Sequence, residues 1–213
     1  MKQTPNSRLW TSVVFFGSLW GLAEATLGYV FHHAMVPGLA GLFMFPVAFF
    51  FMRWAYQHTG RLAVILAMAP VAAGIKLIDL FLPTYSVFTT INPVLVILLE
   101  AVAVYTVFPA LLRHSGWARR FPLILVATVA WKTVFLGVLV LTSLQWTFHS
   151  ILVTGPLVIL RFAVLDSLAN AVLITLLLPK VAQSRSDWLV RYALRPLPAL
   201  CLLLTAIGAE ILL

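Results

Sequence analysis

Charged side chains that interrupt apolar stretches are the residues of this sequence best suited to do chemistry. They are Glu24, Lys76, Asp79, Glu100, Lys132, Arg161 and Asp166. A charge that faces lipid costs several kcal/mol, so each is expected to face the protein interior and to find a partner. Carboxylates can accept hydrogen bonds from amines or hydroxyls, and cations can bind carboxylate or phosphate. The pattern predicts a polar cavity that binds a small polar or zwitterionic solute.

Six of these residues form the predicted binding site: Glu24, Lys76, Asp79, Glu100, Lys132 and Arg161. The alternative is a purely structural network. Lys76 and Asp79 are three residues apart and can pair on one helix face, and Lys132 could neutralise Glu100. Desolvation cancels most of the attraction within a buried ion pair, which favours the solute-binding interpretation. For Asp166 and Asn170, four residues apart, a role in helix packing is expected at least as much as a role in binding.

Composition assigns the chain to the membrane. Hydrophobic residues make up 62% of the sequence and charged residues only 9%, whereas soluble domains carry about 25% charged residues. The net charge of +8 reflects basic loops beside a membrane, and no nucleic-acid partner is inferred from it. The single cysteine, Cys201, cannot form an intramolecular disulfide.

The elements that carry the charges are apolar segments of helical length, because a helix needs roughly 20 apolar residues to cross a bilayer. The segments are 9–31, 37–52, 62–82, 91–112, 121–147 and 152–179. A seventh segment, 197–213, is short and either spans marginally or re-enters. The expected fold is all-α: a polytopic membrane protein with six transmembrane helices in residues 1–180. Residues 181–213 would add an interfacial helix and the short apolar segment.

Basic residues fall on one side of this topology. The connections on the N-terminal side hold 11 Lys and Arg residues, and the alternate connections hold none. The positive-inside rule therefore predicts a cytoplasmic N-terminus. The expected location is a bacterial or archaeal plasma membrane. Residues 82–93, with three Thr and one Ser, would form an external loop, which either covers the cavity or is a neutral loop at the aqueous surface.

Catalytic and cofactor signatures are missing from the sequence. It contains no hydrolase, zinc-protease or nucleotide-binding motif, so an enzyme is not expected and no cofactor is predicted. Two other functions are considered beside solute binding. One is a structural or assembly subunit of a membrane complex. The other is a haem or metal site formed by His32, His33 and His149, which lie near the expected outer surface.

Small residues recur at four-residue spacing on the first helix, at Gly17, Gly21 and Ala25, with Gly28 beyond. Such a stripe lets another helix approach closely, in this chain or in another subunit. Together with the six-helix layout and the outer polar pocket, the sequence GSLWGLAEATLG at 17–28 resembles the substrate-binding subunits of energy-coupling-factor transporters. The resemblance implies a small nutrient as ligand, a membrane coupling subunit docked on the first helix, and a partner ATPase.

Overall fold

The computed structural model describes residues 5–33, 39–82, 87–145, 150–183 and 195–213. These residues form helices without strands, as apolar segments must when only internal hydrogen bonds can satisfy the backbone. Six helical stretches are long and apolar enough to cross a membrane, and a shorter apolar helix follows at Pro196–Leu212. The predicted fold class is confirmed.

The α-helices of the described chain are α1 (Pro5–Ala23), α2 (Tyr29–His33), α3 (Leu39–Thr59), α4 (Ala63–Lys76), α5 (Val87–Arg113), α6 (Trp117–Gln145), α7 (Pro156–Leu160), α8 (Asp166–Gln183) and α10 (Pro196–Leu212). Two π-helical segments, Glu24–Gly28 and Arg161–Leu165, join α1 to α2 and α7 to α8. Two 3₁₀ segments, Leu77–Phe81 and Ile151–Val153, extend α4 and precede α7.

Two boundaries differ from the sequence prediction. Helix α3 continues to Thr59 and not to residue 52, so Arg53, which followed the predicted segment, lies inside the helix with its side chain half-buried. Helix α5 begins at Val87, so Thr89, Thr90 and Asn92 are helical and not part of an external loop. The prediction took Pro93 as the boundary, but membrane helices tolerate proline where neighbouring groups satisfy the freed carbonyl. Residues 83–86 of that loop and 186–194 of the expected interfacial helix lie outside the described residues.

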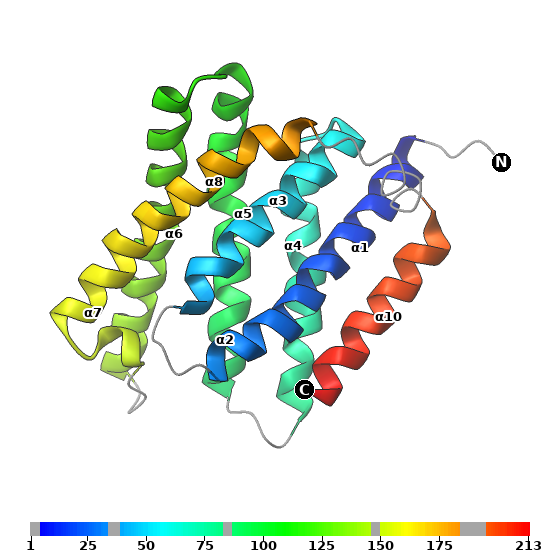
Figure 1. The fold of residues 1–213 in the computed structure, drawn as a ribbon. Coiled ribbons are helices and arrows are strands. Elements are labelled where there is room, and N and C mark those ends of the chain that lie inside the picture. The colour runs from blue at the N-terminus through cyan, green and yellow to red at the C-terminus, as the bar shows by residue number, and fades with distance from the viewer. Residues whose placement is uncertain (1–4, 34–38, 83–86, 146–149, 184–194) are drawn as a thin grey trace.

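The helices pack in two layers (Figure 1). One layer consists of α4, α5 and α6, and the other of α10, α1, α3 and α8. The layers meet where α1 packs on α4 and close at the far end where α6 packs on α8. Large apolar side chains fill the space between them, including Phe16, Trp20, Phe45, Phe49 and Phe108, all at most 1% exposed.

Helix α10 packs lengthwise against α1 (Figure 1). It starts beside the N-terminal end of α1 and runs to the opposite end of the bundle. Its 17 residues span about 26 Å at 1.5 Å per residue. The last apolar segment is therefore one continuous helix that does not turn back on itself.

The small-residue stripe of α1 contacts α4 of the same chain. A Cβ atom added at Gly17 would lie 2.7 Å from Val71 Cβ, and one added at Gly21 would lie 2.5 Å from Ile75 Cδ1. Only residues without a Cβ permit this approach of two helices. The partner of the stripe, left open by the sequence, is α4 at these two positions.

Candidate functional site

Three helices depart from α geometry at their charged residues. The first π-helical segment begins at Glu24, the second begins at Arg161 and ends just before Asp166, and a 3₁₀ segment containing Asp79 follows directly after Lys76. Insertions of this kind in membrane helices free backbone groups and occur frequently at functional sites. The irregular geometry is therefore concentrated where the intramembrane charges lie.

Lys76 is the centre of one charged group. Its Nζ atom lies 2.8 Å from Asp79 Oδ2 and 2.5 Å from Glu210 Oε1. The pairing of Lys76 with Asp79, which belongs to the structural alternative, is present in the structure. Glu210, in α10, was absent from the predicted site. The sequence feature that could have indicated Glu210 is an acid within an otherwise apolar segment. Sequence alone did not decide whether that segment spans the membrane or re-enters.

Glu24 lies between the two charged groups of the bundle. The Trp20 indole donates a hydrogen bond of 3.3 Å to Glu24 Oε1. Glu24 also interacts electrostatically with Lys76 on one side and with Glu100 on the other. It therefore links the Lys76 group to a second one centred on α5 and α6.

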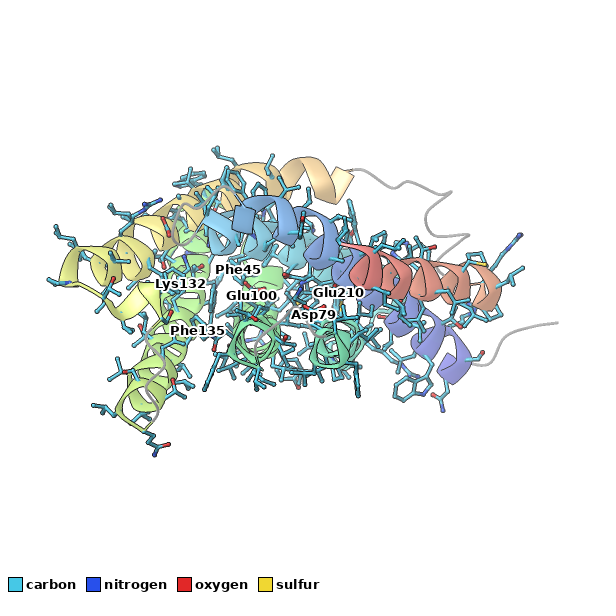
Figure 2. All side chains as sticks on the ribbon, turned by 90° about the horizontal axis from the view of Figure 1, so that it is seen from below. Phe45, Asp79, Glu100, Lys132, Phe135 and Glu210 are labelled. Carbon is cyan, nitrogen blue, oxygen red and sulfur yellow. The ribbon has the colours of Figure 1, made fainter. Side chains whose placement is uncertain are left out.

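Glu100 and Lys132 form the centre of that second group. Both residues are completely buried. Neither Glu100 carboxylate oxygen nor Lys132 Nζ has a hydrogen-bond partner among the described residues, although the two charges interact electrostatically. Figure 2 shows Lys132, Glu100 and the Asp79–Glu210 pair following one another across the bundle, between the two layers. The direct Glu100–Lys132 pairing of the structural alternative is not formed.

Aromatic rings surround the Lys132 ammonium. Its Nζ atom lies 4.9 Å from the centroid of the Phe162 ring and 5.6 Å from that of Trp131. Phe45 and Phe135 extend the group, with centroids 5.7 Å from Trp131 and 6.3 Å from Phe162 respectively. Aromatic faces attract a desolvated cation, so this wall holds the ammonium without neutralising it.

Helix α8 contributes further polar groups. Asp166 is buried and interacts electrostatically with Lys132 and Arg161. The Asn170 amide donates a hydrogen bond of 3.2 Å to the Gly41 carbonyl, which fits the expected helix-packing role. Arg161 was predicted to line the cavity, but its side chain is exposed and lies outside the buried group.

Several buried polar atoms around Lys132 have no partner in the described chain. They are Glu100 Oε1 and Oε2, Lys132 Nζ, Trp131 Nε1, Asp166 Oδ2 and Asn170 Oδ1. Native proteins leave few such atoms, because each costs about 1–3 kcal/mol or more when charged. Acceptors and donors occur together here, which is the arrangement that a zwitterion could satisfy.

Two hollows lie along α4, and neither is lined by the charged residues. One, of about 230 Å³, lies between α4 and α10, and the other, of about 410 Å³, lies between α4 and the first half of α1. Both are apolar. The polar group around Lys132 therefore belongs to the packed interior in this conformation.

The histidine alternative concerns residues that the structure does not describe in full. His149 and the side chains of His32 and His33 lie outside the described residues. Within the part that is described, no three His, Cys, Asp or Glu side chains are grouped to hold a metal ion.

Comparison with protein-family models, with curated proteins and with solved structures gives no match for the chain.

Proposed function

We propose that this protein is a membrane subunit that binds a small zwitterionic solute between its two helix layers, for uptake across the membrane. The observation that carries the proposal is the group of unpartnered buried polar atoms on Glu100, Lys132, Trp131, Asp166 and Asn170. A solute that donates to the carboxylates and accepts from the ammonium and indole would satisfy these atoms.

The proposed solute carries an amine and an acid. Glu100 and Asp166 would bind the amine, and Lys132 would bind the carboxylate or phosphate through charge-assisted hydrogen bonds. The rings of Phe45, Trp131 and Phe162 would contact its apolar part. These roles follow from residue chemistry and from the burial of the group.

Solute entry requires the packed interior to open. The π-helical segments at Glu24–Gly28 and Arg161–Leu165 are suited to this, since broken helical geometry lets a membrane helix bend at one point. We propose that bending there separates α8 from α6 and exposes Lys132 to the side opposite the N-terminus of α1.

Energy for uptake would come from a partner, because the sequence has no nucleotide-binding motif. In energy-coupling-factor systems the small residues of the first helix contact the coupling subunit. Here Gly17 and Gly21 pack on α4, so we propose that a coupling partner uses a different face of this chain.

A structural role remains the competing proposal, and the Lys76 group favours it. Lys76 bonds to carboxylates from two different parts of the chain, as a group that fastens helices would. We therefore restrict the proposed solute site to Glu100, Lys132 and Asp166, and treat Lys76, Asp79 and Glu210 as a separate group.

Three variants separate the two proposals: Lys132→Met, Glu100→Gln and the double variant. Purified proteins would be screened for thermal stabilisation by amino acids and other small zwitterions. If there is a solute site, a zwitterion should stabilise the wild type. Each single variant should fold but bind that solute at least tenfold more weakly, which corresponds to about 1.4 kcal/mol. The double variant should not regain binding.

Thr142→Val is the matched control on α6. The Thr142 hydroxyl bonds to a carbonyl of its own helix, so this variant should fold and bind as the wild type does. A structural network gives the opposite pattern: no zwitterion stabilises the wild type, each single variant unfolds more easily, and the double variant restores stability because no charge is left unpaired.

A further inference from the structure

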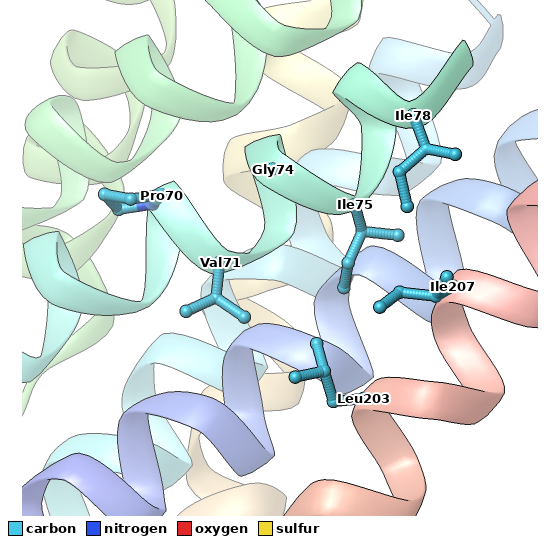
Figure 3. Close-up of a pocket in the computed structure, with 7 residues that line it drawn as sticks. All are labelled: Pro70, Val71, Gly74, Ile75, Ile78, Leu203 and Ile207. Atoms are coloured by element: carbon cyan, nitrogen blue, oxygen red, sulfur yellow. The ribbon is translucent and has the colours of Figure 1, made fainter. Parts of the chain in front are cut away.

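The contact between α10 and α4 has two different parts. At one part of the contact an apolar hollow of about 230 Å³ lies between the helices, lined by Pro70, Val71, Gly74, Ile75, Ile78, Leu203 and Ile207 (Figure 3). At one end, one turn beyond Ile207, Glu210 reaches Lys76. A polar contact therefore fastens α10 to α4 where apolar packing is incomplete.

The carboxyl groups at this contact outnumber the cations. Lys76 Nζ bonds to one oxygen of Asp79 and one of Glu210. The remaining oxygens, Asp79 Oδ1 and Glu210 Oε2, have no hydrogen-bond partner among the described residues. The two acids are 1% and 4% exposed, so water does not cover them. With both ionised, the group carries one uncompensated negative charge in a region of low dielectric.

The two carboxyl groups lie a short distance apart, because both contact the same ammonium: Lys76 Nζ is 2.8 Å from Asp79 Oδ2 and 2.5 Å from Glu210 Oε1. Two carboxylates at that distance repel, whereas a carboxylic acid beside a carboxylate forms a short, strong hydrogen bond. One proton added to the pair makes the group of Lys76, Asp79 and Glu210 neutral. It also gives the free oxygens a donor and an acceptor.

We propose that Asp79 and Glu210 together form a proton-binding site, and that the shared proton fastens α10 to α4. The proton comes from water and binds one carboxylate oxygen, from which it donates to the other carboxyl group. A metal cation would need space beside an ammonium that already lies between the two acids. Glu24, an acid in the π-helical segment after α1 that interacts with Lys76, already accepts a hydrogen bond from Trp20.

The proposal is independent of the solute site around Lys132, because it uses other residues and requires no ligand other than a proton. Its consequence is a pH-dependent attachment of α10. The folded protein holds a proton that unfolded carboxyl groups release at neutral pH, so unfolding releases one proton. The equilibrium constant for unfolding should then rise about tenfold for each unit of increasing pH. This rise should stop at the pH where the folded pair loses its proton.

Infrared spectroscopy and thermal unfolding of the full chain test the proposal. The wild type at neutral pH should show the C=O band of a protonated carboxylic acid, and Glu210→Gln should lack it. In Glu210→Gln the amide donates to Asp79 in place of the proton, so the variant should fold and its unfolding temperature should lose the pH slope. Asp79→Asn should behave in the same way, which provides a second variant if one of them does not fold.

Asp166→Asn is the matched control, since it removes a buried carboxyl group from the other charged cluster. It should keep both the band assigned to the pair and the pH slope. The proposal is overturned if the wild type has no protonated carboxyl band that Glu210→Gln removes, or if Glu210→Gln keeps the full slope. A slope that depends on sodium or potassium, with choline as the reference cation, would assign the site to an alkali ion instead.

Discussion

Gly21 lies so close to Ile75 that a Cβ atom on Gly21 would be 2.5 Å from Ile75 Cδ1 and 3.2 Å from Ile75 Cβ. One turn earlier, the same test at Gly17 meets the Met68 carbonyl oxygen at 2.8 Å. The two positions differ in what must move. Near Gly21 the closest atom is the end of a flexible side chain. Near Gly17 the two closest atoms are Val71 Cβ at 2.7 Å and the Met68 backbone oxygen at 2.8 Å, and these can move away only if the helices separate.

Gly17→Ala should therefore destabilise the protein more than Gly21→Ala. Overpacking of a close helix contact costs about 1–3 kcal/mol, and we expect Gly17→Ala toward the upper end. Gly21→Leu should exceed both, because no rotation of Ile75 makes room for it. The measurement is the thermal unfolding midpoint in detergent.

Gly137→Ala in α6 is the control, since a Cβ there meets nothing within 4 Å. It should be neutral or stabilising by up to about 1 kcal/mol, as alanine is the better helix former. If Gly17→Ala were as stable as Gly137→Ala, the result would contradict the close packing of α1 on α4 at Gly17.

A second prediction concerns the contact of α8 with α3. Asn170→Leu removes the hydrogen bond from the side-chain amide to the Gly41 carbonyl, and should cost about 0.6–2 kcal/mol, the range of hydrogen bonds between membrane helices. Ser167→Ala on the same helix is the control, because its hydroxyl bonds to Ala163 in its own helix. If thermal unfolding gave the two variants equal stability, the Asn170–Gly41 hydrogen bond would not contribute to the stability of the α3–α8 contact.

The sequence predicts the fold better than the site, for a physical reason. Apolar length alone identifies six spanning helices, because lipid leaves a backbone no other way to satisfy its hydrogen bonds. Partners of buried charges depend on how helices pack, which length does not determine. The Lys76–Asp79 pair of the structural alternative is visible in the sequence because the two residues are only three positions apart. Glu210 is 134 residues away from Lys76, so no local spacing indicates their contact.

Arg161 illustrates the same limit. Its position within an apolar segment predicted an inward-facing side chain, yet it is exposed. A π-helical segment begins at this residue, and the extra residue in the turn changes the direction of Arg161 relative to the buried side chains of α8, compared with a continuous α-helix. Sequence periodicity assumes 3.6 residues per turn and cannot anticipate this change of direction.

A third prediction measures the contact between Lys132 and Phe162, whose ring centroid lies 4.9 Å from Nζ. Phe162→Leu loses both apolar packing and cation–π attraction, whereas in a Lys132→Met background it loses the packing alone. The coupling energy from this double-mutant cycle should be about 0.5–2 kcal/mol in favour of the native pair. Phe135→Leu, measured in the same two backgrounds by thermal unfolding, is the comparison, because Phe135 packs on Phe162 and should show smaller coupling to Lys132. A coupling near zero for Phe162 would mean that the ring serves packing only.

The last prediction concerns the side of the membrane that each end of the bundle faces. In Figure 1 the α3–α4 and α5–α6 connections lie at the end of the bundle where α1 begins. Arg61, Arg113, Arg119 and Arg120 lie in or directly beside these two connections, so we expect that end of the bundle to face the cytoplasm. The test uses single cysteines in a Cys201→Ser chain, since Cys201 is exposed. A cysteine at Gly116, between α5 and α6, should react with a membrane-impermeant thiol reagent only after the cells are opened. A cysteine at Ser86, in the connection between α4 and α5, should react in intact cells. The reverse pattern would invert the orientation and move the Lys76 group to the cytoplasmic half, and labelling of both positions in intact cells would contradict the alternating topology itself.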